Sequence, residues 1–292
     1  MPAVQTILAT SAEHAGIKPK PTEVDAFGLT HPGRVRQKNA DHFLVASFHR
    51  AMQIHASSVA RDIGAFSEDS RGYLALVTDG VGALTQAAEG SEQAIKSIAR
   101  HLLDMGEVSL QTSPERADEV AERLRSGMLD AHRSLLALSE ITGGSGTAAT
   151  TMTMIFGVWP RLFVLHAGDS RFYRLRDSRL ERFTVDQTMA QMMIDSGAMS
   201  RETAEASRLR NVLVSALGSS ELDPQIEVLD IRRGDTYLLC TDGLTRHVCD
   251  EEIEAQLLAG SGAESTCRLL VDRALERGGV DNVTVVIVHV PD

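Results

Sequence analysis

The sequence predicts an α+β protein in which helices pack as layers outside β-sheets. Two observations favour this class: short apolar segments of β-type composition separated by turns recur along the chain, and segments with helical periodicity stand between some of them. The strict alternation of strand and helix that a doubly wound parallel sheet requires is missing. Since no repeat or low-complexity linker marks an internal boundary, we expect one domain over residues 25–292. Residues 1–24 lack apolar periodicity and are expected to be extended or mobile.

The expected strands are segments in which apolar, β-branched and aromatic residues follow one another closely, each bounded by turn-forming residues. In chain order they span residues 43–48, 73–78, 148–156, 162–166, 172–175, 236–240 and 283–290.

Two helices are expected between the second and third of these strands, over residues 89–105 and 114–139. The second has the clearer signals, because Ser113 is a suitable N-cap and Pro114 suits the first helical position. Its apolar stripe, which we expect to face the core, consists of Val120, Leu124, Met128, Ala131, Leu135 and Leu138. Further helices are expected over residues 188–196, 201–207, 250–258 and 264–277.

Charge and composition exclude several classes of protein. With 29 Lys plus Arg against 40 Asp plus Glu, the net charge of −11 argues against nucleic acid as a partner. A hydrophobic fraction of 43% predicts a large core rather than disorder. The longest uncharged stretch, residues 141–160, contains four Gly, five Thr, one Ser and one Pro, so we expect no membrane span.

The three cysteines, Cys240, Cys249 and Cys267, are odd in number and form no CxxC pair. This argues against a disulfide framework and against a thiolate zinc site. The first 20 residues have neither a basic start nor a sustained apolar segment, which predicts no secretory signal. A reducing, cytoplasmic location is therefore expected.

Three acidic residues, Asp79, Asp242 and Asp281, stand at the ends of strongly apolar segments, and Thr-Asp-Gly occurs twice among them. A carboxylate at the end of a buried strand is unfavourable unless a cation or a donor compensates it. A single Asp-Gly is most simply a turn, but the repeated pattern favours a metal site. Carboxylates and backbone carbonyls suit Mg²⁺ or Mn²⁺, and two such ions against three carboxylates leave positive charge to attract phosphate.

The chain resembles the metal-dependent Ser/Thr protein phosphatases of the phosphatase 2C (PPM) family, bacterial type. Residues 25–290 carry the resemblance through eight ordered motifs. These are GRVRQKNADHF (33–43), LVTDGVG (76–82), SGTAATTM (145–152), HAGDSRFYRL (166–175), FTVDQT (183–188), RNVLVSALG (210–218), LLCTDGL (238–244) and GGVDNVTVVIV (278–288). The resemblance implies a four-layer α-β-β-α sandwich of two antiparallel β-sheets flanked by helix pairs.

The resemblance also implies the ligands of two Mn²⁺ or Mg²⁺ ions. Asp79 would bridge both ions and the Gly80 carbonyl would be a further ligand. Asp242 and Asp281 would hold one of the ions, and Asp41 would support the second ion through water.

Two further residues take roles from the resemblance. Arg36 would clamp the substrate phosphate with its guanidinium fork, whereas the neighbouring Arg34 is expected to be a surface residue. Asp169 would hold a weak third ion, or would only close a turn with Ser170 and Arg171.

The implied activity is hydrolysis of phosphoserine and phosphothreonine in proteins by a water shared between the two ions, without a covalent intermediate. Ser170 and Cys240 are therefore not needed as nucleophiles. The implied partners are phosphorylated proteins, with an opposing Ser/Thr kinase as a candidate.

Three positions depart from the family pattern. Ala40 replaces a usual Glu, from which we expect a looser second ion site that needs a high metal concentration. Val81 replaces a histidine that protonates the leaving group in some members, so a water is the expected proton donor. Arg246 places a cation where a third ion would need an acidic group, so two tightly held ions are expected.

Residues 186–218 correspond to a flap beside the active site that influences substrate choice in this family, and residues 49–70 have no functional interpretation. Two alternatives to a protein phosphatase stay open. One is a pseudophosphatase that acts as a phosphoprotein-binding regulatory module, which Ala40 favours and the retained aspartates oppose. The other is a phosphoesterase for small metabolites.

Overall fold

The structure is a computed structural model that describes residues 19, 23–48, 52–58, 72–82, 84–105, 116–141 and 148–292. The expected helix start at Ser113 and Pro114 lies outside the described residues, as do most of residues 1–24 and 49–70.

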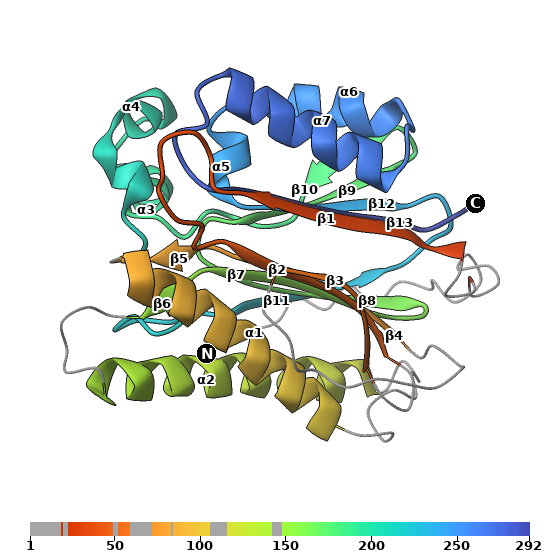
Figure 1. Ribbon diagram of the computed structural model, residues 1–292, viewed down its shortest axis with the longest axis horizontal. Helices are drawn as coiled ribbons and strands as arrows, with labels where there is room; N and C mark the ends of the chain where they lie inside the picture. Colours follow the sequence, from red (N-terminus) through yellow and green to blue (C-terminus); the bar gives the residue numbers. More distant parts are fainter. Residues whose placement is uncertain are drawn as a thin grey trace.

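One large sheet has five antiparallel strands in the order β1-β13-β12-β9-β10. Its strands are β1 (Asp25–His31), β9 (Arg171–Arg176), β10 (Arg179–Arg182), β12 (Thr236–Cys240) and β13 (Val283–His289). The sheet thus pairs the first and the last strand of the described residues, which brings residues near both ends of the described chain side by side (Figure 1).

The second large sheet has six antiparallel strands in the order β11-β8-β7-β4-β2-β3. They are β2 (His42–Phe48), β3 (Met52–Ser57), β4 (Gly72–Thr78), β7 (Met152–Val158), β8 (Arg161–Ala167) and β11 (Gln225–Asp230). A small sheet pairs β5 (Gly80–Val81), which follows β4, with β6 (Ala149–Thr150), which precedes β7.

Helices cover the outer face of each large sheet, so four layers are stacked in Figure 1. Helices α1 (Leu84–Asp104) and α2 (Ala117–Ile141) pack on the six-stranded sheet, and α6 (Asp250–Leu258) and α7 (Ala263–Glu276) pack on the five-stranded sheet. Between the two sheets lies a third apolar cluster that includes Phe43, Phe172 and Tyr237. The α+β prediction with two antiparallel sheets and outer helices is confirmed.

The apolar stripe of α2 faces the core as its spacing predicts. Val120, Leu124, Met128, Ala131 and Leu135 are buried against the six-stranded sheet and α1. This burial stabilises the helix more than its intrinsic propensity does, because an isolated helix gains little in water.

Four short elements complete the fold. Helices α3 (Met189–Asp195) and α4 (Arg201–Ala206) and the 3₁₀ helix η4 (Arg208–Asn211) form the flap between β10 and β11. The flap lies at one end of the sandwich (Figure 1). Helix α5 (Asp242–Thr245) directly follows β12.

Most predicted elements differ from the structure by one or two residues at their ends, and two differ by more. The first helix begins at Leu84 rather than residue 89, and the strand predicted over residues 148–156 is divided into β6 and β7. The division falls at Thr151, whose backbone amide donates to the Asp79 carbonyl instead of continuing one ladder. Within the described part of the chain, no helix has the length and apolar character that a membrane crossing requires.

Strand register brings several chain segments to one edge of the sandwich. Thr78, the last residue of β4, pairs with His42, the first residue of β2. Met152, which begins β7, pairs with Ala167, which ends β8. In the other sheet, the end of β12 pairs with the beginning of β13, so residues 41, 79, 169, 242 and 281 all lie at this edge.

Candidate metal centre

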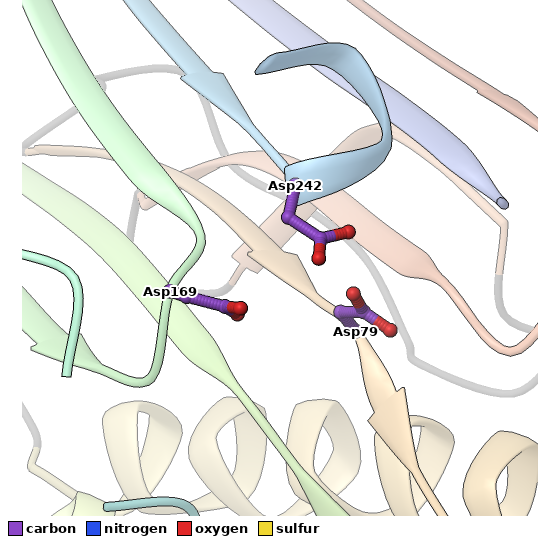
Figure 2. Close-up of side chains that lie close together, drawn as sticks. All are labelled: Asp79, Asp169 and Asp242. Atoms are coloured by element: carbon purple, nitrogen blue, oxygen red, sulfur yellow. The ribbon is translucent and has the colours of Figure 1, made fainter. Parts of the chain in front are cut away.

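Asp79, Asp169 and Asp242 form a cluster of carboxylates at this edge (Figure 2). Each offers one oxygen, and these oxygens all lie within 4.8 Å of one another. Asp79 follows β4 and Asp169 follows β8 in the six-stranded sheet, whereas Asp242 follows β12 in the five-stranded sheet. The cluster therefore joins the two sheets.

Hydrogen bonds from the beginning of β7 fix the backbone of Asp79. The amide of Asp79 donates to Thr151 Oγ1 over 3.0 Å, and its carbonyl accepts from the Thr151 amide and from Thr150 Oγ1, each at 2.9 Å. The carbonyl of Asp79 is thus occupied, and its side chain is held toward the cluster.

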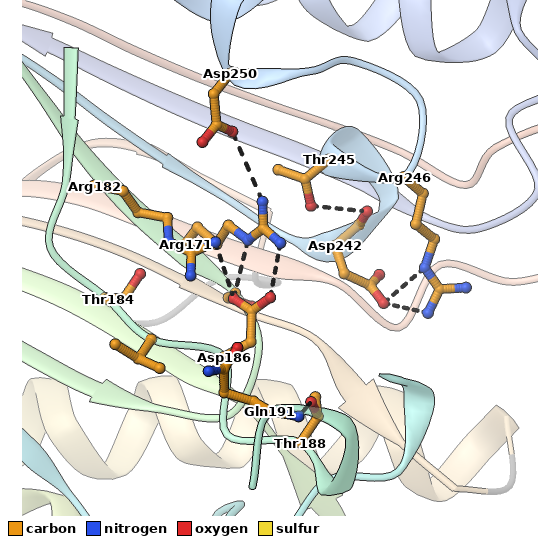
Figure 3. A network of polar contacts seen from close by, with 12 residues as sticks. Arg171, Arg182, Thr184, Asp186, Thr188, Gln191, Asp242, Thr245, Arg246 and Asp250 are labelled. Carbon is orange, nitrogen blue, oxygen red and sulfur yellow. Dashed lines mark hydrogen bonds and ion pairs between the residues drawn. The ribbon is translucent and has the colours of Figure 1, made fainter. Parts of the chain in front are cut away.

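A residue distant in sequence holds the turn that carries Asp169. The Gln187 side chain accepts from the Gly168 backbone amide through its Oε1 atom at 2.9 Å. The backbone amide of Gln187 donates to the Gly168 carbonyl at 2.7 Å. Next to this turn, Arg171 makes a bidentate ion pair with Asp186 at 2.9 and 2.7 Å (Figure 3). The flap therefore begins at residues that are bonded to the Asp169 turn.

Asp242 begins helix α5, and the residue four positions later, Arg246, pairs with it (Figure 3). The Arg246 Nε atom donates to Asp242 Oδ2 at 2.8 Å, and a second guanidinium nitrogen contacts the same oxygen. The other carboxylate oxygen, Oδ1, is buried and has no hydrogen-bond partner. One oxygen of Asp242 is thus available to a cation.

Asp281 precedes β13 rather than following a strand, and Arg36 engages both of its oxygens. The Nε and Nη2 atoms of Arg36 each donate to Asp281 at 2.8 Å. Asn282 anchors the loop that carries Arg36, because its side chain donates to the Pro32 and Lys38 carbonyls and accepts from the Ala40 amide.

Asp41 is buried between the sheets and links them. Its Oδ2 atom accepts from the hydroxyls of Thr241 and Thr284 at 2.7 and 2.8 Å, whereas Oδ1 has no partner. Burial raises the pKa of Asp41 to about 7, although the two threonine hydrogen bonds oppose this shift.

The electrostatics of the cluster fit a divalent cation. Burial, followed by repulsion from neighbouring carboxylates, raises the pKa of Asp79 well above its ordinary value, and the pKa of Asp169 shifts likewise. Arg246 pairs with Asp242, but the unpartnered Oδ1 atoms of Asp41 and Asp242 show that part of this buried negative charge lacks compensation. An oxygen-only donor set of this kind suits Mg²⁺ or Mn²⁺.

The cluster opens into a cavity of about 400 Å³. Arg36, Ala40, Gly80 and Val81 contribute to its lining beside the aspartates. Gly80 has no room for a side chain, because a Cβ there would lie 2.4 Å from the Ala87 carbonyl oxygen. The backbone at Gly80 therefore approaches the first turns of α1 closely.

The sequence-predicted residues meet at one edge of the sandwich. Asp169, expected at a weak third site, lies in one carboxylate cluster with Asp79 and Asp242. Asp281, expected as a ligand together with Asp242, pairs with Arg36 and lies 3.4 Å from an Arg246 nitrogen. Arg34 is exposed, as expected.

Sequence reasoning assigned no role to Thr151, Gln187 and Asn282. Thr151 holds the backbone of Asp79, Gln187 holds the turn that carries Asp169, and Asn282 holds the loop that carries Arg36. These hydrogen bonds span between 19 and 250 positions in sequence. The only sequence signal of the three residues was their place inside the quoted motifs.

Comparison with known proteins identifies relatives of this chain. The family model described as "Protein phosphatase 2C" matches residues 51–276. The serine/threonine protein phosphatase PstP of Mycobacterium tuberculosis is 34% identical over 219 residues, which are 75% of this chain and 40% of that protein. The chain thus spans about two fifths of the length of this curated relative. The serine/threonine phosphatase stp of Listeria monocytogenes is 26% identical over 77% of this chain and 88% of its own length.

Solved structures agree with these relatives. The crystal structure of the M. tuberculosis phosphatase PstP/Ppp has a TM-score of 0.73 at 27% identity and covers 92% of this chain and 99% of its own. The catalytic domain of PstP in complex with two manganese ions has a TM-score of 0.70 at 29% identity, with the same coverage. The family model matches well over half of the chain, and the fold is the same. The chain belongs to the protein phosphatase 2C family.

Proposed function

We propose that this chain is a protein-serine/threonine phosphatase that hydrolyses phosphoserine and phosphothreonine esters with the help of Mn²⁺ or Mg²⁺. The observation that carries the proposal is the meeting of Asp79, Asp169 and Asp242 from two sheets, in a cavity that Arg36 also lines. The related PstP catalytic domain was solved in complex with two manganese ions, which supports a two-ion centre here.

Five residues are proposed to hold the ions. Asp79 would contribute to both ions, the Gly80 carbonyl would be a further ligand, and Asp242 and Asp281 would hold one ion. Asp41 supports the other ion through water. Two ions of this kind supply an activated water and neutralise charge that develops on the phosphoryl group, so no covalent intermediate is needed.

Asp169 is proposed as the ligand of a weak third ion only. Its distance from Asp79 and Asp242 suits an ion, but the positive charge of Arg246 opposes a tightly held one. Ala40 provides no carboxylate beside Asp41, so we propose that the second ion site is more hydrated and that activity needs a high metal concentration.

Arg36 is proposed to bind the substrate phosphate. Its guanidinium donates two hydrogen bonds of 2.8 Å to the two carboxylate oxygens of Asp281. Two phosphate oxygens present the same arrangement of acceptors. Its side chain is 49% exposed, so the guanidinium can reach a ligand in the cavity.

The proposed substrates are phosphorylated proteins, which a Ser/Thr kinase must supply. Residues 25–292 are proposed to form the single phosphatase domain, with the flap between β10 and β11 beside the phosphate site. Asp169 and Asn211, a residue of η4, both line the cavity, which supports contact between the flap and a bound substrate.

The experiment measures hydrolysis of a phosphothreonine peptide with Mn²⁺, with a chelator, and with the variant Asp79→Asn. We expect metal-dependent turnover that the chelator abolishes and that the substitution lowers by about 10³-fold or more. Asp272→Asn, an exposed aspartate in α7, is the matched control and should keep full activity.

Absence of turnover at every Mn²⁺ concentration would contradict the proposal and leave a phosphoprotein-binding module. A small phosphomonoester assayed in parallel tests the substrate class. If its kcat/KM exceeds that of phosphopeptides, a metabolite phosphoesterase replaces the protein phosphatase.

A further inference from the structure

Arg246 lies where two cavities meet beside the carboxylate cluster. The cavity of about 400 Å³ that contains Asp79 and a second cavity of about 640 Å³ on the flap side both include Arg246 in their lining. Asp169 and Asp242 are shared by the two cavities as well. The Arg246 side chain is only 26% exposed, so it is part of the wall rather than a solvated surface arginine.

The two carboxylate oxygens of Asp242 have different environments, because Arg246 contacts only one of them. Helix α5 places residues four positions apart side by side, and Arg246 directs two guanidinium nitrogens to Oδ2. Oδ1 is left buried and without a partner. Because Arg246 holds Oδ2, the carboxylate of Asp242 has a fixed orientation.

The same guanidinium reaches a second carboxylate. Its third nitrogen, Nη1, lies 3.4 Å from Asp281 Oδ2, on the oxygen to which Arg36 also donates. Two arginines thus neutralise Asp242 and Asp281, whereas Asp79 forms no ion pair with a described residue. Positive charge beside Asp242 stabilises its carboxylate and opposes the approach of a dication.

We propose that Arg246 is an internal counter-cation for Asp242. It occupies Oδ2, leaves Oδ1 as the oxygen offered to a metal ion, and competes with dications for Asp242 and Asp281. The inference rests on the proposed metal-dependent function, but it concerns ion binding and not turnover.

The removal of Arg246 should therefore have opposite effects on the stability of the metal-free protein and on the affinity for metal ions. Without metal, Arg246 compensates two crowded carboxylates, so its removal should destabilise the fold. With metal, its charge repels the ions, so its removal should tighten their binding. A residue with only a structural role would lower both stability and ion affinity.

The test measures Mn²⁺ affinity by equilibrium dialysis and the thermal unfolding of the metal-free protein for three variants. Arg246→Met and Arg246→Gln remove the charge, whereas Arg246→Lys keeps it without the planar fork. We expect Mn²⁺ to bind at least about tenfold more tightly to the two neutral variants, and the metal-free variants to unfold at a lower temperature than wild type. The lysine variant should keep an affinity close to that of wild type.

The chain offers a matched control in Arg268. Its Nε and Nη2 atoms both donate to Glu264 Oε1, four positions earlier in α7, at 3.1 and 2.7 Å. This pair has the same geometry but is exposed and lies outside both cavities. Arg268→Met should leave Mn²⁺ affinity unchanged.

Mn²⁺ affinity that is equal or weaker in folded Arg246→Met and Arg246→Gln would overturn the inference. Because neither measurement uses a phosphorylated substrate, this outcome is distinguishable from a failure of the phosphatase assay. Wild-type protein that binds Mn²⁺ but does not hydrolyse the phosphopeptide would instead contradict the proposed function alone.

Discussion

Asp79 combines a rigid backbone with a carboxylate in an unfavourable electrostatic environment. Thr150 and Thr151 hold its amide and carbonyl, so the side chain cannot leave the cluster by a shift of the main chain. Burial raises its pKa first, and the neighbouring Asp41, Asp242 and Asp169 add to the shift. Such a carboxylate destabilises the metal-free fold whenever it is ionised.

This shift predicts a pH dependence of stability at a single residue. The unfolded chain releases the Asp79 proton near the ordinary pKa, whereas the folded chain releases it at a higher pH. Stability of the metal-free protein is therefore lost as pH rises from about 4 through the raised pKa. Asp79→Asn removes this loss, so its free energy of unfolding relative to wild type should increase by at least about 1 kcal/mol between pH 4.5 and 7.5.

Urea unfolding of both proteins in the presence of a chelator measures this difference. Asp272→Asn, which changes an exposed aspartate, should show no such trend. A gap between Asp79→Asn and wild type that stays constant with pH would contradict the assigned burial and repulsion.

At the scale of elements, helix α5 sets the position of Asp242 against β13. A Cβ at Gly243 would lie 1.8 Å from the Asn282 carbonyl oxygen, so the helix can approach the beginning of β13 only with glycine at this position. Asn282 in turn anchors the loop of Arg36. The short helix and this loop are therefore coupled through one backbone contact.

We predict that Gly243→Ala forces α5 away from β13. The displacement should lower the free energy of unfolding by about 1–3 kcal/mol, as overpacking does, and should weaken Mn²⁺ binding because Asp242 moves from the cluster. Chemical unfolding and equilibrium dialysis measure the two effects. Thr245→Ala removes atoms in the same helix instead of adding them and should leave Mn²⁺ binding close to wild type; equal loss in both variants would contradict the steric explanation.

The elements also differ in how far the sequence predicts them. β12 and α6 were predicted with the bounds that the structure has. Four successive apolar or aromatic residues follow Thr236 in β12, and α6 begins with three acidic residues. β1, β3, β10 and β11 were not predicted as strands. Most residues of β1, β10 and β11 are partly or fully exposed and lack an apolar run, so pairing with neighbouring strands decides their conformation; for β1 and β11 these neighbours are distant in sequence.

The same reasoning explains the site. Asp79 and Asp242 were predictable because each follows a buried strand with the same Thr-Asp-Gly sequence. The place of Asp169 beside Asp79 and Asp242 was not, because it depends on side-chain directions at the ends of strands in different sheets. Local pattern carries no information about such directions. The pairing of Arg246 with Asp242 was missed for a different reason, because no helix was predicted over α5.

At the scale of the whole molecule, the metal centre lies across the boundary between the two sheets. Asp79 and Asp169 extend from the six-stranded sheet and Asp242 from the five-stranded sheet. Between the sheets, contact is otherwise apolar over much of the interior, apart from links such as the hydrogen bonds of Asp41 to Thr241 and Thr284. A bound ion would therefore connect the two halves of the sandwich.

This arrangement predicts that metal binding stabilises the entire fold rather than one loop. An ion that binds only the folded chain stabilises it by about 2.7 kcal/mol when its free concentration is 100 times its Kd. We expect Mn²⁺ to raise the temperature of global unfolding with increasing concentration, and a chelator to reverse the effect. Scanning calorimetry measures it, and both sheets should unfold in one transition.

Asp79→Asn is the informative control, because it removes a shared ligand while relieving repulsion among the remaining carboxylates. The variant should unfold at a higher temperature than wild type without metal, yet gain far less from Mn²⁺, so that the order of the two proteins reverses as Mn²⁺ increases. An equal gain in both proteins would place the stabilising ion elsewhere on this acidic chain and would remove Asp79 from its proposed role as a shared metal ligand.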